Sequence, residues 1–259
     1  MTSSQKTNAH APLTHFLCIP LSVPTSRPQL SASLASFQDD VTRPKDLGGF
    51  DLPPDAVRPV GTLHLTLGMM SFPRGGGGEE GLARAVEMLR ALKPREVLAG
   101  LLEGKRNNKS NSNSHPQVLI TLKGLNSMQK PERTTVLYAP PSDPEDILQA
   151  FSEHIRATFR DAGLLAPDER PLLLHATIVN TVYVKGSNRG NKSGQRGRKD
   201  NQRHVVRDAQ AMLDRYEEHV WVEDVPLETI AICRMGAKPL KEDGVVVDVA
   251  YEVEAEIAF

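Results

Sequence analysis

The stretch Leu63-His64-Leu65-Thr66-Leu67 alternates apolar and polar residues, and Leu174-His175-Ala176-Thr177-Ile178 repeats this pattern later in the chain. Successive side chains of a β-strand point to opposite faces, so His64 and Thr66 are expected on one face while the leucines enter the core. The second stretch predicts the same arrangement. The repeated His-x-Thr strand fits an internal duplication of the fold.

Composition alone does not account for this repeat. A chain of 259 residues with eight histidines and 14 threonines would contain about 0.4 His-x-Thr triplets by chance. The chain contains two, both inside an apolar alternation. The alternative interpretation is a pair of half-solvated strands whose polar faces repeat without a chemical role.

The overall composition is that of a folded chain with little net charge. Hydrophobic residues make up 39% of the sequence, and 31 basic residues nearly balance 32 acidic ones. A mainly disordered chain is excluded, and the whole molecule has no electrostatic reason to coat DNA or an anionic membrane. Apolar runs stay well below the roughly 20 residues of a membrane span, and residues 1–11 lack the apolar stretch of a signal peptide. We therefore expect an intracellular protein, in the nucleus, the cytoplasm or both.

The cysteine and histidine pattern argues against a metal centre. Cys18 and Cys233, the two cysteines of the chain, cannot form a disulfide framework or a four-cysteine zinc site, and they are expected to be buried thiols in a reducing compartment. Neither His-x-Thr segment brings Cys, Asp or Glu at ligand spacing, so His64 and His175 would supply only two zinc ligands. A Ser-His-Asp triad stays possible by composition, but the chain lacks the Gly-x-Ser-x-Gly elbow.

Helices and strands alternate along the rest of the chain. Apolar residues at three- and four-residue spacing predict helices over 28–37, 81–92, 144–162 and 205–216. Short apolar runs predict strands over 14–21, 97–102, 117–122, 133–139, 172–184, 228–235 and 245–257, with 97–102 and 117–122 as a hairpin. Asp143 is the expected N-cap of the helix 144–162, and Gly163 its C-terminal stop.

We predict a single domain over residues 14–259, preceded by a disordered tail at 1–13. Flexible insertions are expected near 74–80, 105–115 and 185–203. Residues 185–203 carry seven basic residues and one acid, which indicates either an electrostatic contact for a nucleic-acid backbone or a solvated loop of variable length. The charges are interspersed with Gly, Asn and Ser rather than clustered as in a nuclear localisation signal.

Two imidazoles that face each other across a cleft suit general acid–base catalysis. An ordinary histidine pKa of about 6.5 lets His64 and His175 each serve as base or acid at neutral pH. The hydroxyls of Thr66 and Thr177 can donate hydrogen bonds to the non-bridging oxygens of a phosphate. The pattern therefore favours in-line phosphodiester chemistry between the two histidines, which needs no metal and no other cofactor.

The chain resembles the 2H phosphoesterases, a family named for two His-x-Thr/Ser motifs on the strands of a bilobal fold. It is similar in particular to the branch that includes the central domain of A-kinase anchoring protein 7 and the C-terminal domain of activating signal cointegrator 1 complex subunit 1. The similar blocks are 14–21, 64–69, 122–125, 136–139 and 174–181. The resemblance extends from about Thr14 to Phe259.

The resemblance implies an α+β fold of two pseudo-symmetric lobes, each an antiparallel sheet with outer helices, around a central nucleotide-binding cleft. It implies His64, Thr66, His175 and Thr177 as catalytic residues. The expected activity is that of a metal-independent phosphodiesterase acting on RNA ends or on cyclic or oligonucleotide phosphates. The alternative is a nucleotide- or RNA-binding module, with little turnover, in a nuclear transcription-coactivator or DNA-repair complex. A monomeric domain is expected in either case.

Four further residues are candidates for substrate binding. Phe16, Tyr138 and Tyr183 lie on or beside strands of the similar blocks, where an aromatic ring can stack on a base. Arg234 lies on a late strand, where a guanidinium can meet a phosphate. The alternative for the three aromatic residues is a place in the core, and for Arg234 an ordinary place on the surface.

Overall fold

A computed structural model describes residues 12–73, 77–105, 118–184, 206–207 and 209–259. The expected tail 1–13 and the expected insertions near 105–115 and 185–203 lie wholly or almost wholly outside the described residues. The insertion expected near 74–80 lies outside them only in part, because the chain is helical from Gly78 onward.

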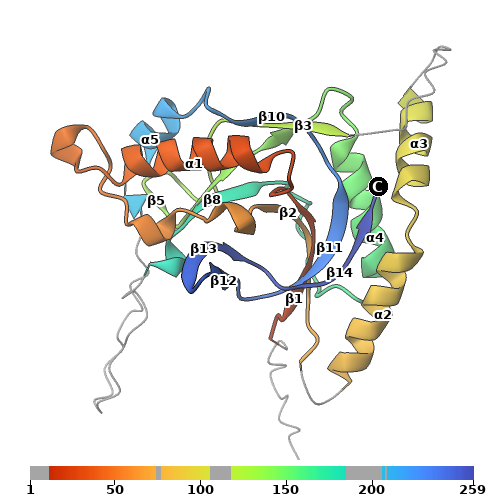
Figure 1. Ribbon diagram of the computed structural model, residues 1–259. Helices are drawn as coiled ribbons and strands as arrows, with labels where there is room; N and C mark the ends of the chain where they lie inside the picture. The colour runs from red at the N-terminus through yellow and green to blue at the C-terminus, as the bar shows by residue number, and fades with distance from the viewer. Residues whose placement is uncertain (1–11, 74–76, 106–117, 185–205, 208) are drawn as a thin grey trace, which may run out of the picture.

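The fold is built on a seven-stranded antiparallel sheet (Figure 1). In order across the sheet, the strands are β14 (Val253–Ala258), β11 (Thr229–Arg234), β1 (His15–Pro20), β2 (His64–Met70), β8 (Ala176–Asn180), β6 (Val136–Ala139) and β4 (Asn126–Ser127). The strand β2 contains the first His-x-Thr motif, and β8 begins inside the second. The two motifs are therefore neighbours in the middle of the sheet.

The two halves of this sheet meet at a single register pair, Leu65 of β2 with Ala176 of β8. Beyond this pair the edge of β8 is covered by the segment that leads to β2. Val57 forms a bridge to Val179, and the Arg58 amide donates to a β8 carbonyl at 2.8 Å. The resemblance implies two lobes, and the strands that carry the motifs form two halves, β14-β11-β1-β2 and β8-β6-β4, joined edge to edge as one continuous sheet.

Shorter strands and 3₁₀ turns surround the main sheet. A three-stranded sheet is made of β10 (Val220–Pro226), β3 (Leu119–Lys123) and β7 (Pro141–Ser142). Two-stranded pairs are made of β12 (Lys238–Glu242) with β13 (Val245–Ala250), and β5 (Arg133–Thr134) with β9 (Val206–Arg207). The 3₁₀ turns are η1 (Lys45–Leu47), η2 (Pro54–Ala56), η3 (Val60–Thr62) and η4 (Thr181–Tyr183).

Helices lie on the outside of the sheets. They are α1 (Arg27–Val41), α2 (Gly78–Ala91), α3 (Pro94–Lys105), α4 (Leu148–Asp161) and α5 (Gln210–Arg215). The helix α1 packs on β10, α2 on β14 and β11, α4 on β2, and α3 on α4. In Figure 1, α2, α3 and α4 stand together beyond β11 and β14. Antiparallel sheets with outer helices confirm the α+β fold class.

The main core lies between the sheets and these helices. Its largest fully buried side chains include Trp221 and Phe37. The helix α4 buries Phe151, Ile155 and Phe159, which follow the four-residue spacing that predicted an amphipathic helix. Burial of this stripe fixes α4 against the sheet that carries the motifs.

A second, smaller apolar cluster lies on the other face of β1 and β11. It consists of Phe16, Cys18, Ala231 and Cys233, whereas the alternating residues of both strands belong to the main core. Both cysteines are buried free thiols, as expected. Pairing of β1 with β11 brings their Sγ atoms to 3.8 Å from each other, although they lie far apart in the sequence.

Several expected elements differ from the structure. Residues 97–102, expected as a hairpin strand, lie inside α3, because a short apolar run does not distinguish a strand from a buried helix. The expected strand 245–257 is two strands, β13 and β14. The expected helix 205–216 is reduced to α5 because residues 206–207 pair with β5, and the expected strand 172–184 is regular only over β8.

The ends of α4 show how local polar groups set its length. The helix begins at Leu148, later than the expected residue 144. Ile147, not the expected Asp143, is therefore the N-cap residue. The Asp143 carboxylate instead accepts hydrogen bonds from the amides of Ile147 at 2.6 Å and Leu148 at 3.3 Å, from the turn that precedes the helix. Gly163 follows the helix with a φ of +70°, as a C-terminal glycine stop requires.

Candidate active site

The two His-x-Thr motifs lie on adjacent antiparallel strands, and their central residues pair with each other. The central residues are fully buried, so the histidines and threonines on either side of them project to the opposite face of the sheet. All four are half-buried there. The structure thus brings the four predicted catalytic residues together on one face.

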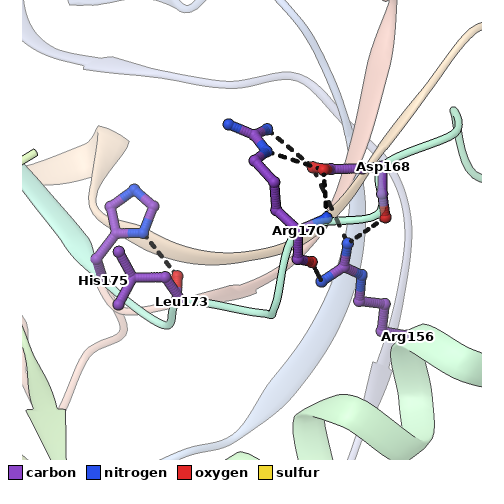
Figure 2. Close-up of polar contacts among 5 residues, drawn as sticks. All are labelled: Arg156, Asp168, Arg170, Leu173 and His175. Carbon is purple, nitrogen blue, oxygen red and sulfur yellow. Dashed lines mark hydrogen bonds and ion pairs between the residues drawn. The ribbon is translucent and has the colours of Figure 1, made fainter.

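Both imidazoles are held by the same local hydrogen bond. The Nδ1 atom of His64 lies 2.8 Å from the carbonyl oxygen of Thr62, and that of His175 lies 2.8 Å from the carbonyl oxygen of Leu173 (Figure 2). A carbonyl oxygen only accepts, so Nδ1–H is the donor in each case. Each ring therefore keeps its Nε2 atom for proton transfer.

The environment of His64 keeps its imidazole neutral at physiological pH. Burial lowers the pKa of His64 to about 4, and the positive charge of Arg58 and the second imidazole, His175, act in the same direction. The hydrogen bond to the Thr62 carbonyl opposes this shift without cancelling it. A neutral Nε2 is a proton acceptor, so His64 has the protonation state of a general base.

Aromatic rings flank both histidines. The ring centroid of His64 lies 4.8 Å from that of Phe16 and 5.4 Å from that of Tyr251. The ring centroid of His175 lies 5.4 Å from that of Tyr138. Phe16 is only 4% exposed and packs against His64 from within the small apolar cluster. It therefore has the core position that was the alternative to base stacking. Tyr138 is half-buried beside His175.

A cluster of Arg58, Tyr183 and Tyr251 borders the His64 side of the site. The guanidinium of Arg58 lies 3.8 Å from the ring centroid of Tyr183, and its Nη2 atom donates to the Tyr251 hydroxyl at 3.4 Å. The Asn180 side chain caps η4, the turn that carries Tyr183. The sequence indicates Tyr183 as a candidate for substrate binding but does not indicate Arg58 or Tyr251. Neither of these two residues belongs to a repeated or periodic pattern in the sequence.

Tyr251 reaches the site because the β12–β13 hairpin is fixed to the segment before His64. Asp248 of β13 forms an ion pair with Arg27 and accepts a hydrogen bond from the Gly61 amide at 3.4 Å. A Cβ atom on Gly61 would lie 2.5 Å from an Asp248 carboxylate oxygen. This close approach of the hairpin to the chain therefore requires glycine at position 61.

Arg234 is not part of this site. Its neighbour Cys233 belongs to the small apolar cluster on the site's face, so the Arg234 side chain projects to the opposite face. It pairs in register with His15, at the end of β1 farthest from His64. Its Nε donates to Glu254 at 2.7 Å. The sequence placed Arg234 on the correct strand but could not predict the carboxylate that engages it.

The segment that leads to His175 is anchored to α4 (Figure 2). Arg156 of α4 donates to the carbonyl oxygens of Asp168 at 3.2 Å and Arg170 at 3.4 Å. The Asp168 carboxylate accepts two further bonds of 2.8 Å from the Arg170 guanidinium, which lowers the pKa of Asp168 to about 2. In Figure 2 the side chains of Arg170 and His175 rise from the same side of this segment. Arg156 therefore holds the backbone that positions the second imidazole.

Within the described ranges, no three or more His, Cys, Asp and Glu side chains are grouped so that they could hold a metal ion. Likewise, no helix in the part of the chain that the structure describes combines the length and the apolar character needed to cross a membrane.

Comparison with known proteins gives the family. The model of the AKAP7 2'5' RNA ligase-like domain matches residues 13–259. The uncharacterized protein C15D4.13c of Schizosaccharomyces pombe is 25% identical over 218 residues, which cover 84% of this chain and 86% of that protein. Among solved structures, E. coli LigT complexed with 3'-AMP has a TM-score of 0.45 and 14% identity, covering 95% of this chain and 98% of LigT. TT0787 of Thermus thermophilus has a TM-score of 0.44 and 16% identity, over 95% and 97% of the two chains. With the family model covering nearly the whole chain, this protein belongs to the AKAP7 2'5' RNA ligase-like domain family, within the 2H phosphoesterase superfamily.

Proposed function

We propose that this protein is a metal-independent phosphodiesterase that acts on RNA ends or on cyclic or oligonucleotide phosphates. Membership of the 2H phosphoesterase superfamily supports a phosphodiesterase-type activity on RNA or nucleotides. The observation that carries the proposal is the antiparallel pairing of the two motifs, each with its Nδ1 fixed by a carbonyl. This pairing brings both imidazoles and both threonine side chains to one face of the sheet.

His64 acts as the general base in this proposal. Its neutral Nε2 takes the proton of the attacking water or ribose hydroxyl as the new P–O bond forms. Protonated His175 donates its Nε2 proton to the leaving oxygen as the old P–O bond breaks, which restores the charge balance. Thr66 and Thr177 donate hydrogen bonds to the non-bridging oxygens between the imidazoles.

The proposal is tested by assaying the purified protein in the presence of EDTA. The substrates are 2',3'-cyclic nucleotides, 2',5'-oligoadenylate, and short RNAs with cyclic or extended 3' ends. We expect turnover of at least one class, undiminished by the chelator, because both proton transfers use side chains of the chain itself. Binding of a nucleoside monophosphate without turnover of any substrate would contradict the enzymatic proposal and favour a binding module.

The pH dependence of kcat/KM should reflect the low pKa of His64. A general base works only when it is unprotonated, so activity should fall as the pH drops through about 4 and stay level above it until the acid is lost. Rates would be measured at constant ionic strength, with circular dichroism to establish that the protein stays folded at each pH. If kcat/KM instead fell at low pH with an apparent pKa near the ordinary histidine value of about 6.5, the general base would be a group other than His64.

Arg156 should act as a positioning residue for His175. Arg156→Ala removes the two hydrogen bonds to the backbone before His175, and we expect kcat to fall about 10-fold because a small displacement of a catalytic group is costly. The KM should change little, since Arg156 does not touch the face that binds substrate. Arg160→Ala is the matched control, because Arg160 lies on the same helix and pairs with its neighbour Asp161. Equal kcat values for Arg156→Ala and Arg160→Ala would show that the hydrogen bonds of Arg156 are not needed to position His175.

A further inference from the structure

Arg58 is a buried cation at the edge of the site. Only 7% of the residue is exposed, and its backbone is fixed by the hydrogen bond from its amide to the Ile178 carbonyl. Its guanidinium packs on the Tyr183 ring and donates to the Tyr251 hydroxyl. Neither contact supplies a negative charge. The first is with the face of an aromatic ring, and burial raises the pKa of Tyr251 to about 12, which keeps its hydroxyl protonated.

The charge of Arg58 has no carboxylate to balance it among the described residues. The ion pairs within 4.0 Å that those residues form do not include Arg58, whereas buried Asp248 and half-buried Glu254 are engaged by Arg27 and Arg234. A buried charge without a counterion is costly, and proteins retain one mainly where an anion compensates it. The surroundings of Arg58 therefore indicate an anionic ligand.

The location of Arg58 indicates where this anion would lie. The Tyr251 hydroxyl accepts the Arg58 hydrogen bond, and the Tyr251 ring is perpendicular to the His64 ring, with 5.4 Å between their centroids. The Arg58 charge is also close enough to His64 to lower its pKa. Arg58 is therefore on the His64 side of the face that carries both motifs, whereas Tyr138 flanks the His175 side. The anion compensating Arg58 would lie beside the proposed base.

We propose that Arg58 is a substrate-anchoring residue that binds a phosphate oxygen at the two-motif site, with Tyr183 and Tyr251 holding its guanidinium in place. This inference rests on the proposed function, since it takes the ligand to be a phosphate ester. Arginine suits the task because it stays charged when buried and presents several donors to phosphate oxygens. The negative charge of the bound phosphate compensates Arg58, so the residue contributes to affinity for substrate and to stabilisation of the transition state.

The test compares Arg58→Met, which keeps an unbranched apolar stem but loses the charge, with Arg58→Lys, which keeps the charge. Arg234→Met is the matched control, because Arg234 is an arginine paired with Glu254 on the opposite face. Isothermal titration with inorganic phosphate and kinetics with the preferred substrate are measured for each. We expect Arg58→Met to weaken phosphate binding and to lower kcat/KM by about 10- to 100-fold, Arg58→Lys to recover part of the loss, and Arg234→Met to match the wild type.

A second measurement uses the unmodified protein, so it does not depend on the folding of any variant. The ¹⁵Nε resonance of Arg58 is followed by NMR while inorganic phosphate is added, and a shift that saturates with the calorimetric affinity is expected. An unchanged Arg58 resonance at saturating phosphate would overturn the proposal, as would a folded Arg58→Met variant with wild-type phosphate affinity.

The two proposals fail in different ways. If the wild type binds phosphate through Arg58 but cleaves no substrate, the anchoring role stands and the phosphodiesterase proposal is lost. If the wild type cleaves a substrate and Arg58→Met does so equally well, the enzymatic proposal stands and the anchoring role is wrong.

Discussion

Replacing either His64 or His175 with alanine should lower kcat/KM by about 10²- to 10⁴-fold, the usual contribution of a positioned general acid or base. The loss is expected from both variants because proton removal and proton delivery occur in the same displacement of the proposed mechanism. His64→Ala removes the neutral acceptor, and His175→Ala removes the donor for the leaving oxygen. Both side chains are half-buried on the face of the sheet that carries the two motifs, so the variants should remain folded.

The double variant distinguishes a cooperating pair from two independent contributions. Catalytic groups that act as a unit are strongly non-additive, so His64→Ala/His175→Ala should be about as slow as the slower single variant. His154→Ala is the control, because His154 is an exposed histidine on α4 that lies outside both motifs. Single-turnover rates with EDTA present would be compared, with circular dichroism to confirm folding. A wild-type rate for either His64→Ala or His175→Ala would contradict the two-histidine mechanism.

The four residues of the candidate site could be predicted to share a strand face from the sequence because they lie in a local pattern. Period-two alternation places His64 and Thr66 on one face wherever the strand lies, and the same holds for His175 and Thr177. The pattern cannot say that the two strands are adjacent, or that Leu65 pairs with Ala176. That register makes one site out of two motifs, and it follows from the topology of the whole sheet.

Residues that reach the site through long-range packing escaped prediction. Arg58 lies in a proline-rich connection, and Tyr251 lies between β13 and β14 in an acidic segment that the sequence indicated as one strand. Arg58 and Tyr251 lie close together because the Asp248 carboxylate of the hairpin accepts a hydrogen bond from the Gly61 amide. The adjacency of Cys18 and Cys233 has the same origin, since it depends on the pairing of β1 with β11. Local patterns carry no information about such pairings.

Replacement of Trp221, which lies on β10 and outside both motifs, should have the largest effect on stability. Trp221 is fully buried; its ring centroid lies 5.0 Å from that of Phe37 and 4.5 Å from that of His219, and its Nε1 donates to the Gly124 carbonyl at 2.8 Å. Trp221→Ala opens a cavity and leaves that buried carbonyl without its donor, so we expect the free energy of unfolding to fall by about 3–5 kcal/mol.

Urea unfolding would be followed by circular dichroism, because Trp221 is the sole tryptophan of the chain and its replacement removes the fluorescence signal. Trp221→Phe keeps most of the packing but loses the hydrogen bond, and it should cost about 1–2 kcal/mol. Val247→Ala, at a 51% exposed position of β13, should change the stability by less than about 0.5 kcal/mol. Equal unfolding midpoints for Trp221→Ala and Val247→Ala would contradict a stabilising role of Trp221 in the packing of β10 against α1. Under conditions where Trp221→Ala stays folded, its kcat/KM should equal that of the wild type, because Trp221 lies outside both motifs and contributes to stability, whereas the proposed chemistry depends on the two histidines.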